Sequence, residues 1–149
     1  MKISIACDHG GFLLKETVKK WLTDNNYEVL DFGCDSLDSI DYPDYGVKAA
    51  RAVKNHECDK GIVICTTGIG MSIVANKVRG IRCALVSDLV SAEMTRLHND
   101  TNMLALGAKI VSEELALNII KVWLETEFEG GRHIRRVEKI SKIEVEENE

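Results

Sequence analysis

The sequence predicts an α/β fold: a three-layer α/β/α sandwich with a Rossmann-like parallel sheet of about five strands. Short apolar segments typical of strands alternate along the chain with amphipathic segments typical of helices. This alternation favours right-handed βαβ units and a parallel sheet covered on both faces. The length of 149 residues, 45% of them apolar and 29% charged, suits one globular domain. We expect residues 1–149 to form that domain, with residues 134–149 as a C-terminal helix and acidic tail.

The first half of the chain contains three predicted strands and two predicted helices. Apolar or alternating runs predict the strands, and apolar residues at helical spacing predict the helices. Pro43 fits the first turn of the second helix, because proline is favoured at the start of a helix. The strands are residues 3–7, 27–32 and 61–65; the helices are residues 12–24, with Leu14, Val18, Trp21 and Leu22 on the apolar face, and residues 43–55, with Tyr45, Ala49, Ala52 and Val53.

The second half of the chain continues the same alternation. A short helix over residues 71–78 ends before Gly80, and Ser87 or Asp88 suits the cap of the next helix. Residues 82–86 and 103–106 are the remaining predicted strands. A helix before His98 is expected to point Val90, Met94 and Leu97 inward, and a helix from Ser112 to bury Leu115, Ile119, Ile120 and Trp123. A hinge at Gly130–Gly131 leads to a final helix with Ile134, Val137, Ile140 and Ile143 on one stripe. That last stripe covers either its own domain or a partner.

Composition and charge exclude several classes of protein. The net charge of −5 argues against a general nucleic-acid binder. The five cysteines are odd in number and show no CxxC spacing, which argues against a disulfide framework and a zinc ribbon and favours a reducing, cytoplasmic setting. The sequence starts without a signal-peptide pattern, and no stretch is long and apolar enough to cross a membrane.

The segment Cys65–Gly70 is the main candidate for chemistry. It lies where a predicted buried strand ends and a helix begins, which is where open α/β sheets bind ligands. Backbone amides at a helix start favour negative charge, and Gly68 and Gly70 let a ligand approach the backbone. Positive surroundings also lower the pKa of a thiol. The alternatives are that Cys65 is a small buried apolar residue and that the glycines only form a tight turn.

Other strand ends and connections supply polar groups to the same edge. Asp8 and His9 follow the first strand, and histidine is suited to proton transfer near neutral pH. Arg132 and Arg136 are four residues apart, so on a helix they share a face and can grip a phosphate. The alternatives are surface histidines and a solvated basic face. A parallel sheet brings its strand ends to one edge, so we expect several of these groups, with His98, to converge.

These groups favour a metal-free and cofactor-free reaction on a phosphorylated compound. The histidines lack partners at metal-ligand spacing, so no metal site is predicted. Proton abstraction next to a carbonyl fits the set best, because it needs a base, an acid and stabilisation of an enediolate oxyanion.

Seven short segments form an ordered set of motifs across nearly the whole chain. They are Ala6–Phe12, Asp41–Tyr45, Ile64–Ser72, Ala75–Lys77, Gly80–Arg82, His98–Asn102 and Glu129–His133. In these segments and in their order the sequence resembles the type B ribose-5-phosphate isomerase family, which includes galactose-6-phosphate isomerase.

The resemblance implies a role for each matching residue. Cys65 is similar to the base that moves a proton between C1 and C2, and Thr67 to a hydroxyl that assists at the sugar oxygens. Asp8 and His98 are similar to groups that open the sugar ring. The resemblance implies that the enediolate is bound by the backbone of Thr66, Thr67, Gly68, Ile69 and Gly70. It also implies that His9, Arg132 and Arg136 bind the phosphate and that Asn99 contacts the substrate. The family implies a homodimer, sometimes paired into a homotetramer, in which His98 and Asn99 reach the partner's site.

The chain departs from the family pattern at three positions. Thr66 stands where glycine is frequent, so either the turn tolerates it or Thr66 narrows the pocket. Lys109 stands where arginine is common and lacks the bidentate fork, which weakens it as a phosphate ligand. One branch of the family uses a glutamate base where this chain has Met71, which leaves the role of base to Cys65.

The resemblance implies an aldose–ketose isomerase of the pentose phosphate pathway that interconverts ribose 5-phosphate and ribulose 5-phosphate. Two alternatives are the same chemistry on a six-carbon sugar phosphate, allose 6-phosphate or galactose 6-phosphate, and a phosphosugar-binding module without catalysis. Rates with a panel of five- and six-carbon aldose phosphates test the first alternative. Binding of a sugar phosphate without turnover would identify the second.

Overall fold

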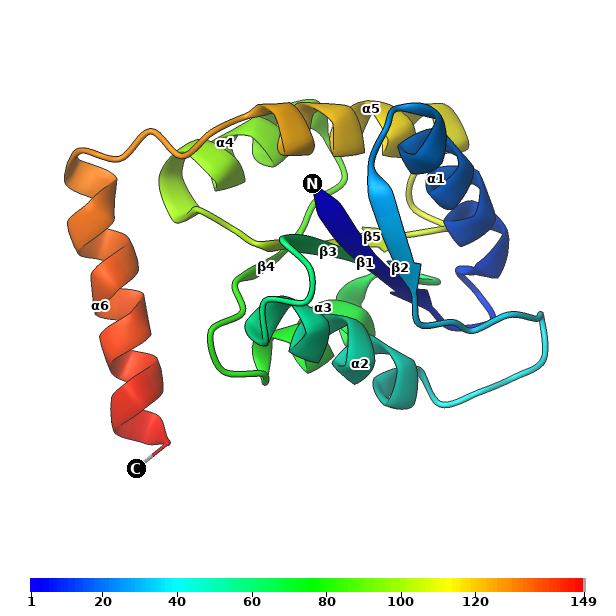
Figure 1. Ribbon diagram of the computed structural model, residues 1–149, viewed down its shortest axis with the longest axis horizontal. Helices are drawn as coiled ribbons and strands as arrows, with labels where there is room; N and C mark the ends of the chain where they lie inside the picture. The colour runs from blue at the N-terminus through cyan, green and yellow to red at the C-terminus, as the bar shows by residue number, and fades with distance from the viewer. Residues whose placement is uncertain (149) are drawn as a thin grey trace.

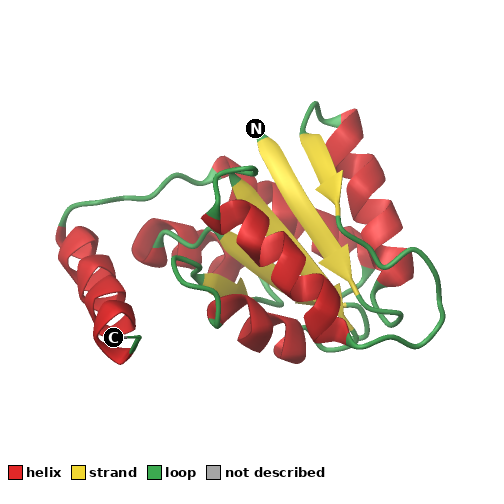
Figure 2. Ribbon diagram, turned by 60° about the horizontal axis from the view of Figure 1, so that its bottom comes forward, coloured by secondary structure: helices red, strands yellow, loops and turns green. Residues whose placement is uncertain are grey.

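The computed structural model describes residues 1–148 and shows a five-stranded sheet with helices on both sides (Figures 1 and 2). In chain order the elements are β1 (Lys2–Cys7), α1 (Phe12–Asp24), β2 (Glu28–Asp31), α2 (Tyr42–Lys54), β3 (Lys60–Cys65), α3 (Ile69–Asn76), β4 (Cys83–Leu85), α4 (Leu89–Asn99), β5 (Met103–Gly107), α5 (Glu113–Glu125) and α6 (Arg132–Glu147). The predicted α/β fold and its strands are confirmed, with boundaries that differ by one or two residues.

The order of the strands places a topological switch point between β1 and β3. All neighbouring strands are parallel, in the order β2-β1-β3-β5-β4. The chain winds outward from β1 to β2, returns through α2 to β3 on the other side of β1, and continues away from it. The order therefore reverses between β1 and β3, and ligands in such sheets bind at the carboxyl ends of the strands beside this point.

Alternating side chains of the central strands fill two separate cores. Ile62 and Ile64 of β3 face α1 and α5, whereas Val63 and Cys65 face α2 and α3. Figure 1 shows α1, α4 and α5 on one side of the sheet and α2 and α3 on the other. The three-layer arrangement follows from this alternation, because a strand buried on both faces needs a covering layer on each.

Helix α6 lies apart from this sandwich, and the described part of it contacts chiefly α4 (Figures 1 and 2). Its apolar side chains remain largely uncovered: Ile134, Ile140 and Ile143 are 47%, 46% and 58% exposed. A groove of about 660 Å³ separates Ile140 and Ile143 from Arg82 on the body. The acidic residues that were expected to form a tail belong to this helix as far as Glu147, and Glu149 lies outside the described residues.

Helix α4 corrects one prediction about the core. Val90 and Met94 were expected to point inward, but they are 68% and 37% exposed, and Leu97 is half-buried. The helix instead buries Ala92, Thr95 and Arg96. Arg96 is satisfied there, because its guanidinium donates to the carbonyls of Thr101 and Thr126 and to the carboxylate of Asp100, at 2.7–3.0 Å. In α5, Ile119, Ile120 and Trp123 are buried as expected, whereas Leu115 is half-buried.

A buried ion pair anchors α1 to the end of β2. The Lys15 side chain is 1% exposed, and its Nζ donates to both carboxylate oxygens of Asp31, at 3.1 and 2.9 Å, and to the carbonyl of Cys34. Asp31 also accepts hydrogen bonds from Lys19 Nζ and from the amide of Gly33. Because a buried ammonium is costly without a carboxylate partner, the pair fixes α1 against the segment that follows β2.

Replacing Asp31 by alanine is expected to lower the free energy of unfolding by roughly 3 kcal/mol, because buried Lys15 would lose its closest carboxylate and keep only the more exposed Glu16, at 3.4 Å. Urea denaturation followed by circular dichroism measures this change. Asp24→Ala is the matched control, since it removes the exposed Lys20–Asp24 pair and should cost less than about 0.5 kcal/mol. Equal losses in the two variants would contradict the expectation.

The same pair makes stability fall in acid. Burial raises the pKa of Asp31, but the hydrogen bonds from Lys15 and the Gly33 amide outweigh it and hold that pKa below its ordinary value of 3.8. A carboxyl whose pKa is lower in the folded chain stabilises the fold above the unfolded pKa, and this contribution is lost as the pH falls through the folded pKa. The stability gap between wild type and Asp31→Ala should therefore be constant near neutral pH and shrink below about pH 4.

Candidate active site

Cys65 ends β3 at the switch point of the sheet, and its side chain is almost buried, at 5% exposure. Its Sγ accepts a hydrogen bond from the Gly68 amide at 3.1 Å. Two residues later, Thr67 Oγ1 accepts the amide hydrogen of Ile69 at 3.3 Å. Two amides of the turn, expected to face a ligand, are thus bonded to the turn's own side chains. Among residues 1–148 the Gly70 amide has no such partner and is a free donor in the first turn of α3, as is the amide of the buried Met71.

The continuation of β5 holds this turn in place. The amides of Ala108 and Lys109 donate to the carbonyls of Cys65 and Thr66, both at 2.9 Å. Gly68 has a φ of +79°, and a Cβ there would lie 2.8 Å from the Leu106 carbonyl carbon and 3.0 Å from the Gly107 nitrogen. Both the backbone angle and the close approach require glycine at this position. The Lys109 side chain is exposed beside the turn.

The loop after β1 lies against the same turn. Asp8 is buried, at 6% exposure, and its Oδ1 accepts the Gly11 amide at 3.1 Å. His9 is half-buried, and its Nδ1 accepts the Ile40 amide at 3.3 Å, which leaves the proton on Nε2. The hydroxyl of Thr66 contacts this loop, because a Cβ on Gly10 would overlap Thr66 Oγ1. Asp8, His9 and Cys65 therefore belong to one side of the molecule.

Thr66 fits the turn without backbone strain. Among the described residues, the non-glycine positions with positive φ are Asn26, His56 and Asp100. Thr66 is therefore not forced into a left-handed conformation, and its effect is to fill space over the β1 loop.

Tyr42 is a site neighbour to which sequence reasoning gave no role. Tyr42 is the first residue of α2, and its ring lies against the start of α3. A Cβ on Gly70 would lie 2.7 Å from Tyr42 Cζ. The ring is 39% exposed, so it borders the free Gly70 amide and remains open to solvent. The only signal in the sequence was its place in the Asp41–Tyr45 motif.

The other predicted site residues lie elsewhere within one chain, which corrects the expected convergence. His98 and Asn99 end α4 at the amino edge of the sheet, next to Met103, which pairs with Gly61 at the start of β3. Cys65 is four residues further along β3, roughly 13 Å at the rise of a strand. Arg132 and Arg136 are in the first turns of α6, which contacts α4 (Figure 1). One chain therefore presents two separate groups of candidate residues.

The fold and this turn define a doubly wound α/β protein with a cysteine at the carboxyl edge of its sheet, beside the switch point. A family model described as Ribose/Galactose Isomerase matches residues 3–140. The chain belongs to this family.

Individual relatives match over almost the full chain. Ribose-5-phosphate isomerase B of Escherichia coli is 48% identical over 147 residues, which cover 99% of each chain. The structure of Clostridium thermocellum ribose-5-phosphate isomerase B is 54% identical, with a TM-score of 0.97, covering 98% of this chain and 99% of that one. The Mycoplasma genitalium enzyme, solved with bound ribulose-5-phosphate, is 39% identical with a TM-score of 0.93 over 97% of each chain.

Gly68→Ala is expected to destabilise the fold by roughly 2 kcal/mol more than Gly80→Ala. Both glycines have positive φ, +79° and +87°, but only a Cβ at position 68 meets neighbouring backbone, whereas at position 80 nothing lies within 4 Å. The difference between the variants therefore reports the contact of position 68 with the β5 backbone and with the Leu85 side chain of β4. Urea unfolding of both proteins measures it, and similar losses would show that the contact contributes nothing.

Proposed function

We propose that this chain is an aldose–ketose isomerase that interconverts ribose 5-phosphate and ribulose 5-phosphate without a metal or other cofactor. The observation that carries the proposal is the Cys65 thiol, placed at the switch point beside Asp8 and the free Gly70 amide. Relatives named ribose-5-phosphate isomerase B support the substrate.

Cys65 is proposed as the base. Its thiolate takes the proton from C2 of the open-chain aldose, the C–H electron pair forms the C1–C2 double bond, and the carbonyl oxygen receives the negative charge. Return of that proton to C1, with transfer of the O2 proton to O1, gives the ketose. The Gly68 amide that donates to Sγ holds the sulfur at the start of the turn.

Two groups of the turn suit the oxygens of the enediolate. The Gly70 amide is a free donor at a helix start, where negative charge is favoured. The Thr67 oxygen already accepts the Ile69 amide, so its hydroxyl hydrogen remains to donate to a sugar oxygen and to assist the transfer between O2 and O1. We assign the enediolate contacts to Thr66–Gly70 on this basis.

The remaining roles follow the resemblance. We assign ring opening to Asp8 and His98, a substrate contact to Asn99, and the phosphate to His9, Lys109, Arg132 and Arg136. The Nε2–H of His9 supports this, since its Nδ1 is held by the Ile40 amide and the opposite side of the ring is left to donate.

We propose that the active unit is a homodimer, with homotetramers as pairs of dimers. His98, Asn99, Arg132 and Arg136 lie on elements remote from their own Cys65, so they complete the site of a second copy. The exposed apolar residues of α6, with Val90 and Met94 of α4, are the surface that such a copy would cover.

We place the reaction in the cytoplasm, and we assign no nucleic-acid or membrane partner. The five cysteines are free thiols, which suits a reducing compartment. No helix within residues 1–148 has the length and apolar character needed to cross a bilayer.

A second candidate is the same reaction on a six-carbon sugar phosphate, such as allose 6-phosphate or galactose 6-phosphate. The family description, which names both ribose and galactose, favours keeping it. A sugar with one more carbon needs a longer pocket, but the chemistry at C1 and C2 is the same. Rates with five- and six-carbon aldose phosphates decide between the two.

Cys65→Ala is expected to lower kcat/KM for ribose 5-phosphate by about 10³-fold or more, because no other base is assigned to the C2 proton. Cys83→Ala is the control, since Cys83 lies in β4 and has no role in the proposed reaction. Circular dichroism and urea unfolding should show that both variants fold. An active Cys65→Ala enzyme would remove Cys65 as the base.

Mixing two inactive variants is expected to restore activity if the sites are shared. In a mixed dimer of Cys65→Ala with His98→Asn, one site combines an intact Cys65 with an intact His98 from the other chain. Random assembly of equal amounts should recover about a quarter of the wild-type activity, since half of the dimers are mixed and each holds one good site. Co-expression with two affinity tags isolates the mixed dimer. An inactive purified mixed dimer would show that each site is built from one chain.

A further inference from the structure

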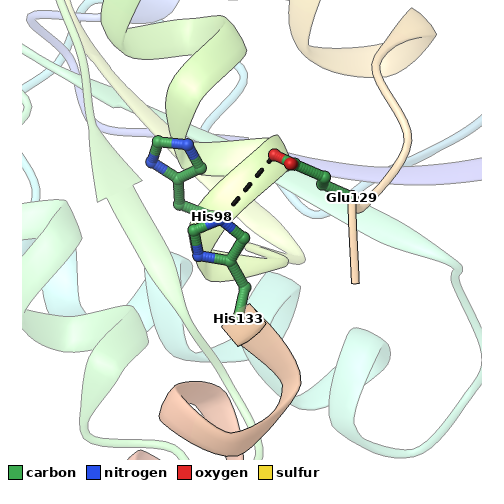
Figure 3. Close-up of side chains that lie close together, drawn as sticks. All are labelled: His98, Glu129 and His133. Carbon is green, nitrogen blue, oxygen red and sulfur yellow. Dashed lines mark ion pairs between the residues drawn. The ribbon is translucent and has the colours of Figure 1, made fainter. Parts of the chain in front are cut away.

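His98, Glu129 and His133 form a compact cluster away from Cys65 in the same chain. One ligand atom from each, two imidazole nitrogens and a carboxylate oxygen, lies within 4.8 Å of the others. Figure 3 shows the Glu129 carboxylate directed at the His133 ring, with the His98 ring beside it. The Glu129 Oε2–His133 Nε2 distance is 3.7 Å. The two rings are stacked, with centroids 4.4 Å apart and an interplanar angle of 16°.

The His133 Nε2 atom is the unusual member of this cluster. His133 is 4% exposed, and its Nε2 is a buried side-chain nitrogen without a hydrogen-bond partner among residues 1–148. A buried polar atom of this kind is costly unless something binds it. The atom faces the cluster, because it is paired with the Glu129 carboxylate (Figure 3).

The backbone that carries the three side chains is fixed. The Glu129 amide donates to the Leu97 carbonyl at 3.2 Å, next to His98 in the last turn of α4. The His133 amide donates to the Gly130 carbonyl at 3.1 Å in the first turn of α6. These bonds join the end of α4, the connecting segment and the start of α6, so the three side chains are held together by a preformed scaffold.

We propose that these three side chains bind a zinc-class divalent cation. Two imidazoles and a carboxylate are a known zinc ligand set that leaves the fourth tetrahedral position to water. Imidazole nitrogens favour Zn²⁺, Co²⁺ and Ni²⁺ over the oxygen-seeking Mg²⁺ and Ca²⁺.

Small side-chain movements complete the coordination. Tetrahedral ligands about 2.0 to 2.1 Å from zinc lie roughly 3.4 Å from one another, so the Glu129–His133 pair is nearly at ligand spacing. Nitrogen lone pairs lie in the ring plane, so one of the stacked rings must rotate. His98 is half-buried and Glu129 is 55% exposed, and these two side chains can move toward the buried His133.

Metal binding would inhibit catalysis if His98 has its proposed role. The ion would occupy the imidazole that is assigned to ring opening, and this consequence rests on the proposed function. Binding of the ion by the cluster does not depend on the reaction.

Calorimetric titration of the chelator-treated full-length protein with Zn²⁺ tests the site. We expect one ion per chain, and an affinity at least about tenfold weaker in Glu129→Gln and in His133→Gln. His56→Gln, which changes an exposed histidine outside the cluster, should bind like wild type. Glu129 is exposed, so its variant tests the site even if the buried His133 substitution impairs folding. Absence of Zn²⁺ binding, or undiminished binding by Glu129→Gln, overturns the proposal.

Two further measurements separate the site from other ligands and from the reaction. The Co²⁺-loaded protein should show tetrahedral visible absorption without an intense sulfur-to-metal band; such a band would place the metal on a cysteine and overturn the assignment. Zn²⁺ should inhibit the wild-type isomerase reversibly, with a chelator restoring activity, and should inhibit Glu129→Gln at least about tenfold less strongly. A chain that binds Zn²⁺ as described but isomerises no sugar phosphate would refute the proposed function and leave the metal site standing.

Discussion

The backbone contact between the turn after β3 and the end of β5 is the constraint on which the candidate site depends. Two amides of β5's continuation bind the carbonyls of Cys65 and Thr66, and Gly68 lies against the backbone of Leu106 and Gly107. The turn's own bonds, from the Gly68 amide to Cys65 and from the Ile69 amide to Thr67, are then made within a fixed frame. Helix α3 is only eight residues long, so a neighbouring strand supplies rigidity that the helix alone would not.

The same topology divides the candidate residues between two edges of the sheet. A strand in a parallel sheet ends at the carboxyl edge, whereas each connecting helix ends at the amino edge. Cys65, Asp8 and His9 follow strands, but His98 and Asn99 end a helix. Proximity within one chain is therefore ruled out by chain direction. In a two-fold dimer, by contrast, the amino edge of one copy can face the carboxyl edge of the other, and the two groups meet.

Local patterns predicted the sheet and the Cys65–Gly70 turn because both depend on short-range features: apolar runs, glycines and capping residues. Long-range pairings were not predictable in this way. Nothing near Lys15 in the sequence indicates that its ammonium is buried on Asp31, sixteen residues away. Likewise, apolar periodicity selected the wrong face of α4, because hydrogen bonds from Arg96 to the segments that follow make the polar face the buried one. The place of Tyr42 over Gly70 also depends on tertiary packing.

The proposed second copy would account for both the exposed apolar residues of α4 and the isolation of α6. Helix α4 exposes apolar side chains to water and buries an arginine, which is unfavourable for a single chain. The exposed isoleucines of α6 add to that cost. A second copy that covered both would remove this cost, and the residues beside these surfaces are His98, Arg132 and Arg136. If both proposals hold, His98 would have two alternative partners: a sugar in the neighbouring site, or Glu129 and His133 around a cation. Because one ring cannot serve both, metal occupancy and ring opening are expected to compete at this residue.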